Sequence, residues 1–78
     1  MVDIMTRAII GSKFAQRRAD LLADGYMIMF ERFDKLGAFC KLRHRNGSII
    51  ILSCDYGAGD ITQKTNGKVV HSEKVHQP

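Results

Sequence analysis

A short basic segment near aromatic residues is the part of this sequence whose residue types best suggest a chemistry. Residues 41–45 read Lys-Leu-Arg-His-Arg. Alternate residues of an extended strand point to one side, so Lys41, Arg43 and Arg45 project together. Proteins that bind single-stranded nucleic acid stack bases on exposed rings and hold phosphates with Lys and Arg. This pattern gives one candidate function, nucleic-acid binding through Lys41, Arg43, Arg45, Phe33 and Phe39, although no RNP-type sequence is present.

No residue set in the sequence is typical of a catalytic or metal site. Residues 55–60, Asp-Tyr-Gly-Ala-Gly-Asp, match neither a G-x-G-x-x-G phosphate loop nor an EF-hand, and we interpret them as a turn. His44, His71 and His76 lack metal-site spacing, and no cysteine pair accompanies them at CxxC distance. No nucleophile has both a base and an orienting group within reach in the expected sheet. We therefore expect a non-catalytic protein without a cofactor.

Composition sets limits on the fold class and the partners. The chain has 78 residues, 45% apolar and 26% charged, which predicts a single small globular domain over residues 1–78. A chain this small buries a modest core, and a second copy could supplement it. The net charge of +4 favours acidic partners, nucleic acid included. No apolar stretch suits a membrane span or a signal peptide, and two cysteines fit a reducing compartment, so we expect a cytoplasmic protein.

The expected elements are one helix followed by strands. Good helix formers and an absence of proline predict a helix over about residues 4–24, closed by a left-handed Gly25. A start at Ser12, or a short strand over residues 2–10, are the alternatives. Turn signals then divide the rest into strands over about 26–34, 38–45, 48–54, 60–65 and 68–73, with a frayed tail over 74–78. Short connections make consecutive strands neighbours, which predicts an α+β fold with an antiparallel meander of four to five strands.

The turns also predict the register of the strands. A type I′ turn at Asn46-Gly47 places His44 opposite Ile49. A three-residue loop with a left-handed Gly37 closes the first hairpin, and it pairs Glu31 with Lys41 and Phe33 with Phe39. In this register Cys40 and Cys54 point to opposite faces, which disfavours a disulfide. The expected core on the helix side consists of Tyr26, Ile28, Phe30, Cys40, Leu42, Ile49 and Ile51.

The opposite face of the sheet gives the main functional hypothesis. A single helix cannot cover both faces, and a solvated face should be polar. In the predicted register this face nevertheless carries large apolar side chains among its charges, and such patches usually mark interfaces. We therefore expect a small interaction module that binds either another protein or a second copy of itself, as a homodimer. The expected contact residues are Met27, Met29, Phe33, Phe39, Ile50 and Leu52.

The helix carries two separate apolar groups. One contains Ile4, Ala8, Ala15, Ala19 and Leu22, and the other contains Ile10, Phe14 and Leu21. Both groups cannot contact one flat sheet equally. Either long arginine stems cover the gap between them, which we favour, or one group contacts a second subunit.

Overall fold

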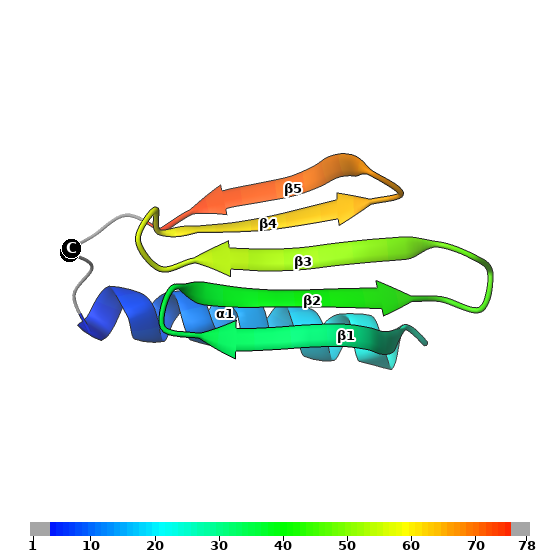
Figure 1. Cartoon of the computed structure of the whole chain (residues 1–78), viewed down its shortest axis with the longest axis horizontal. Helices are drawn as coiled ribbons and strands as arrows, with labels where there is room; N and C mark the ends of the chain where they lie inside the picture. The colour runs from blue at the N-terminus through cyan, green and yellow to red at the C-terminus, as the bar shows by residue number, and fades with distance from the viewer. Residues whose placement is uncertain (1–3, 76–78) are drawn as a thin grey trace.

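The helix lies along one face of a five-stranded antiparallel sheet and runs in roughly the same direction as the strands (Figure 1). The structure is a computed structural model that describes residues 4–75. The chain order and bounds of the elements are α1 Ile4–Ala23, β1 Met27–Asp34, β2 Gly37–Arg43, β3 Ile49–Asp55, β4 Asp60–Thr65 and β5 Lys68–Lys74. The strands follow one another as a meander, which confirms the expected α+β fold. No helix among the described residues is long and apolar enough to cross a membrane.

The bounds of α1 confirm the longer of the helices that the sequence allowed. The helix begins at Ile4 rather than at Ser12, and the first residues of the chain form no strand in the described part. It ends as expected, because Gly25 has a φ of 98° and Tyr26 follows it. The Tyr26 N–H donates to the Leu21 carbonyl and the Gly25 N–H to the Leu22 carbonyl, both at 3.1 Å. These two bonds form a Schellman motif and turn the chain sharply into β1.

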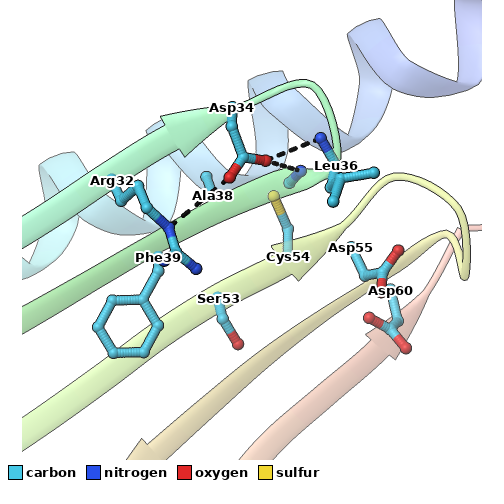
Figure 2. Close-up of a pocket in the computed structure, with 10 residues that line it drawn as sticks. Arg32, Asp34, Leu36, Ala38, Phe39, Ser53, Cys54, Asp55 and Asp60 are labelled. Carbon is cyan, nitrogen blue, oxygen red and sulfur yellow. Dashed lines mark hydrogen bonds and ion pairs between the residues drawn. The ribbon is translucent and has the colours of Figure 1, made fainter.

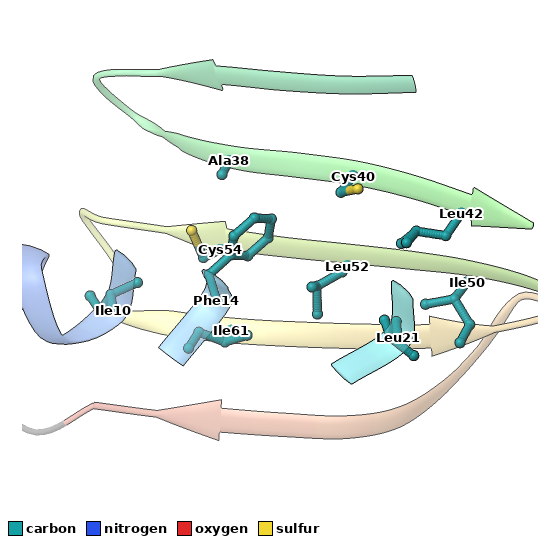
Figure 3. Packing of buried hydrophobic residues seen from close by; sticks show 10 residues of the cluster. All are labelled: Ile10, Phe14, Leu21, Ala38, Cys40, Leu42, Ile50, Leu52, Cys54 and Ile61. Carbon is teal, nitrogen blue, oxygen red and sulfur yellow. The ribbon is translucent and has the colours of Figure 1, made fainter. Parts of the chain in front are cut away.

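The core lies between α1 and the middle of the sheet (Figure 3). The helix contributes Ile10, Phe14 and Leu21, so the other apolar group of the helix, which begins at Ile4, points away from the sheet. The sheet contributes alternate residues of its three inner strands, namely Ala38, Cys40, Leu42, Ile50, Leu52, Cys54 and Ile61. These positions define the covered face of the sheet, and the opposite side is called the open face below.

The connection between β2 and β3 differs from the predicted type I′ turn. The His44 N–H donates to the Ser48 carbonyl, and the Gly47 N–H donates to the His44 carbonyl, both at 2.9 Å. This is a type I turn followed by the left-handed Gly47, which has a φ of 97°. The loop is one residue longer than a type I′ loop, so the register moves and Arg43 pairs with Ile49. A single-residue change of register reverses the faces of an entire strand relative to its neighbour.

The connection between β1 and β2 also differs from the prediction. Asp34 pairs with Gly37, so the loop contains only Lys35 and Leu36. The Oδ1 atom of Asp34 accepts hydrogen bonds from the N–H groups of Leu36 at 2.8 Å and Gly37 at 3.1 Å, which stabilises this tighter turn. Gly37 does not adopt the expected left-handed conformation. A glycine is needed there for another reason, because a Cβ would collide with the Cys54 carbonyl oxygen of β3.

These two turns correct the predicted faces. Ile50 and Leu52 belong to the core, whereas Ile49 and Ile51 lie on the open face. The two-residue β1–β2 loop reverses Phe30 to Phe33, and a bulge at Met29 returns Ile28 and Met27 to the faces predicted for them. Phe33 therefore packs against Phe14 of the helix, with ring centroids 6.1 Å apart, rather than opposite Phe39. Phe30, expected in the core, is 54% exposed.

The cysteines were also placed incorrectly by the predicted register. Both Cys40 and Cys54 point to the covered face, and both are buried and unpaired. They therefore act as small apolar residues of the core. Desolvation by burial raises the pKa of both thiols, which keeps them protonated near neutral pH.

The C-terminal hairpin follows the prediction more closely. Asn66 and Gly67 both have positive φ angles, 51° and 86°, as a type I′ turn requires. The tail is ordered further than expected, because β5 includes Lys74 and the Val75 N–H donates to the Gly59 carbonyl at 2.7 Å. The remaining part of the predicted frayed tail, including His76, lies outside the described residues.

Candidate interaction surface on the open face

The open face is organised as rows of side chains that run across the strands. The register aligns Asp34, Gly37, Asp55, Asp60 and Lys74 at the end of the sheet near the β1–β2 turn. The next row contains Arg32, Phe39, Ser53, Thr62 and Ser72. Then follow Phe30, Lys41, Ile51, Lys64 and Val69, and finally Met27, Arg43 and Ile49. The face therefore changes from acidic to basic along the strands.

An apolar centre occupies β1 to β3 of this face. It consists of Phe30, Phe39, Ile49 and Ile51, and no other part of the described chain covers it. The rings of Phe30 and Phe39 meet with centroids 6.0 Å apart and an interplanar angle of 62°. Edge-to-face contacts of this kind hold both rings in place while leaving Phe30 accessible. The centre is thus a preformed apolar patch on a sheet face whose other residues, Met27 and Val69 excepted, are mostly polar.

The basic end is formed by Lys41, Arg43 and Lys64. None of the ion pairs within residues 4–75 involves these three cations. The carboxylate expected among them, Glu31, lies on the covered face and binds Arg18 instead of Lys41. Because Glu31 lies on the covered face, it does not neutralise the cations of the basic end on the open face.

The acidic end is formed by Asp34, Asp55 and Asp60, which surround a shallow hollow of about 410 Å³ (Figure 2). Asp34 also pairs with Arg32 at 3.6 Å. The Oδ1 atom of Asp55 accepts hydrogen bonds from the N–H groups of Gly57 at 2.8 Å and Ala58 at 3.0 Å, which confirms the turn interpretation of residues 55–60. No ion pair within residues 4–75 involves Asp55 or Asp60, and Lys74 is the cross-strand neighbour of Asp60 in this row.

The potential metal ligands and the two described histidines, His44 and His71, have structural surroundings. Within the described residues, no group of His, Cys, Asp or Glu is arranged to hold a metal ion. His44 packs against Tyr26 with centroids 5.0 Å apart and accepts the Asn46 N–H at 3.2 Å, and His71 lies 3.4 Å from Glu73. These contacts give both histidines structural neighbours.

The residues predicted to bind a partner are divided between the two faces. Met27 and Phe39 lie on the open face, and Met29 is exposed at the bulge of β1. Phe33, Ile50 and Leu52 are directed to the covered face.

The predicted nucleic-acid residues are similarly divided. Lys41, Arg43 and Phe39 share the open face, whereas Arg45 lies in the β2–β3 loop. There it lines a hollow of about 550 Å³ together with Met27, Arg43 and His44.

Sequence reasoning missed Phe30, Ile49, Ile51, Arg32 and Lys64 as residues of the open face. A signal for two of them existed within β3 itself. Ser53 and Asp55 are polar, and alternation from these positions places Ile51 and Ile49 on the solvent side. The turn type outweighed this signal in the prediction. For Phe30 the prediction was wrong because its face follows from the β1–β2 loop, which holds two residues instead of the expected three.

A second exposed apolar surface lies on the outer side of α1. It consists of Ile4, Ile9, Ala8, Ala15, Ala19 and Leu22, and Ile4 is 87% exposed. Half of its members are alanines, whose side chains are small. Of the arginines on this helix, Arg7 lies over the Tyr56 ring, 4.9 Å from its centroid, and Arg18 binds Glu31 of the sheet. The favoured expectation that long arginine stems cover the gap between the two apolar groups stays a prediction.

No family model matches the chain, and comparisons with curated proteins and with solved structures also found no match.

Proposed function

We propose that this chain is a non-catalytic interaction module that binds a protein surface, a second copy of itself included, through the open face. The observation that carries the proposal is the apolar centre on the side of the sheet opposite α1, where Phe30 is exposed and Phe39, Ile49 and Ile51 are half-buried. Removing such a patch from water is favourable by about 25 cal/mol per Å² of apolar surface. We place this activity in the cytoplasm, where the two core thiols would stay reduced.

Self-association is tested by sedimentation velocity across a range of protein concentrations. The double variant Ile49→Thr/Ile51→Thr removes apolar area from the open face and keeps β-branched side chains that suit a strand. The matched control, Ile4→Gln/Ile9→Gln, removes two isoleucines from the outer side of α1. We expect the wild type and the control to associate and the open-face variant to remain monomeric.

Two outcomes contradict self-binding through this face. A wild-type chain that stays monomeric at high micromolar concentration excludes it. Association that is lost in Ile4→Gln/Ile9→Gln but kept in the open-face variant assigns the interface to α1. Circular dichroism and thermal unfolding show whether each variant is folded.

The second candidate function is the binding of single-stranded nucleic acid. It is favoured by the Phe30–Phe39 pair next to the unpaired cations Lys41 and Arg43. Stacking on such rings contributes about 1–3 kcal/mol per base.

The test for this candidate is fluorescence anisotropy with short labelled oligonucleotides at about 50 and 200 mM salt, because counterion release makes true phosphate binding strongly salt-dependent. Phe30→Leu should weaken binding and Phe33→Leu, on the covered face, should not. An absence of binding at about 50 mM salt removes this candidate.

A further inference from the structure

We propose that the occupant of the open face is a second copy of this chain, stacked face to face with its strands running in the opposite direction. This inference rests on the proposed function and adds the partner and its orientation. The two copies are related by a two-fold axis that lies between the sheets and runs across the strands. Such an isologous contact uses the same patch on both copies.

The charge distribution of the open face supports this orientation. Asp55 and Asp60 lie at one end of the strands, and Lys41, Arg43 and Lys64 lie toward the other. A two-fold axis across the strands brings the acidic end of each copy over the basic end of its partner. Asp55 then approaches Arg43 of the other copy, and Asp60 approaches Lys64. Both contacts occur twice, because the axis repeats them.

The other face-to-face arrangement brings like charges together. A two-fold axis parallel to the strands exchanges β2 with β4, because β3 is the middle strand of the sheet. Lys41 would then face Lys64 of the other copy, and Asp55 would face its own counterpart. Like charges placed directly opposite one another strongly disfavour an interface. The antiparallel arrangement avoids this repulsion. It places Ile51 of the middle strand near the centre of the contact and the phenylalanine pair at its β1–β2 side.

The area of the face suits a weak dimer. Strands about 4.8 Å apart with a rise of about 3.3 Å per residue give a sheet of roughly 19 by 23 Å, or about 450 Å² on each copy. Stacking two such faces removes roughly 1,000 Å² from water, which is near the lower limit for a specific interface. The expected dimer therefore forms at micromolar rather than nanomolar concentrations.

The experiment reverses the charge of the basic end. In Lys41→Glu/Arg43→Glu, both ends of the open face are acidic, so the antiparallel contact becomes repulsive. The control Lys35→Glu/Lys68→Glu changes the net charge equally, at exposed positions outside the open face. We measure the dimer dissociation constant of each protein by sedimentation at about 50 and 300 mM salt, since salt screens such contacts.

Raising the salt concentration should change the dimer affinity of the wild type and of the basic-end variant in opposite directions. Wild-type dimers should weaken as salt rises, because attractive charges are screened. The basic-end variant should associate at least about tenfold more weakly at low salt and should recover part of this loss at high salt. The control should stay within about threefold of the wild type, as rim charges contribute little to affinity.

The outcomes separate this inference from the proposed function. A dimer that needs Ile49 and Ile51 but is insensitive to Lys41→Glu/Arg43→Glu overturns the antiparallel arrangement and leaves the interaction module intact. Equal weakening by the control assigns the effect to net charge and also overturns the arrangement. A chain that is monomeric throughout but binds oligonucleotides with steep salt dependence overturns both and supports the nucleic-acid candidate.

Discussion

Arg18 of α1 and Glu31 of β1 form a two-point ion pair on the covered face, with Nε–Oε2 and Nη2–Oε1 distances of 2.9 and 3.1 Å. Both side chains are 29% exposed, so water screens the pair only in part. The Cys40 thiol lies 3.7 Å from the same carboxylate. The ion pair therefore links α1 to β1, an edge strand of the sheet.

Replacing Glu31 with Gln should therefore destabilise the fold. The variant keeps the size of the side chain but removes the charge that strengthens both hydrogen bonds, and we expect a loss of about 1 kcal/mol. Urea unfolding monitored by circular dichroism measures it. Lys35→Gln, at an exposed loop position, is the control and should unfold like the wild type. An unchanged stability in Glu31→Gln would show that the pair is fully screened.

The same pair predicts how stability depends on pH. The hydrogen bonds from Arg18 lower the pKa of Glu31, and those from Lys13 and His71 lower the pKa of Glu73. A carboxyl whose pKa is lower in the folded state contributes stability above its unfolded value of about 4.3, and this contribution is lost as pH falls through the folded value. Stability should thus decrease below about pH 5. The decrease should be smaller in Glu31→Gln, and an identical decrease in both proteins contradicts the assignment.

Two glycines should respond to alanine with opposite signs. A Cβ on Gly37 collides with the Cys54 backbone, which cannot move without disturbing the β2–β3 pairing, so Gly37→Ala should lose about 1–3 kcal/mol. Gly11 lies within α1, and nothing lies within 4 Å of the position that a Cβ would take there, so Gly11→Ala should gain about 0.5–1 kcal/mol. Thermal unfolding of both variants measures the difference. A stable Gly37→Ala protein would contradict the close approach of the two strands.

The sequence was sufficient for the element order and insufficient for the faces of the sheet. The helix, its end at Gly25 and the meander follow from local signals, namely helix formers, a left-handed glycine and short turns. The face assignment depended on whether the Asn46-Gly47 loop holds two or three residues. Both loops accept Asn-Gly, because each needs a left-handed residue at Gly47. The sequence of the turn does not decide between them, whereas the polar residues Ser53 and Asp55 of β3 favour the longer loop.

Leu52 and Ile51 are neighbours in β3, and the register between β2 and β3 decides which of them is buried. Leu52 is fully buried beneath α1, whereas Ile51 lies on the open face. Leu52→Ala should therefore cost about 2–5 kcal/mol through lost burial and a residual cavity. Ile51→Ala should cost about 1 kcal/mol or less when measured at a concentration where the chain is monomeric. Urea unfolding of the two variants gives the comparison. The register predicted from a type I′ turn requires the opposite ranking, so a larger loss in Ile51→Ala would return Ile51 to the core and remove the apolar centre on which the proposed interface depends.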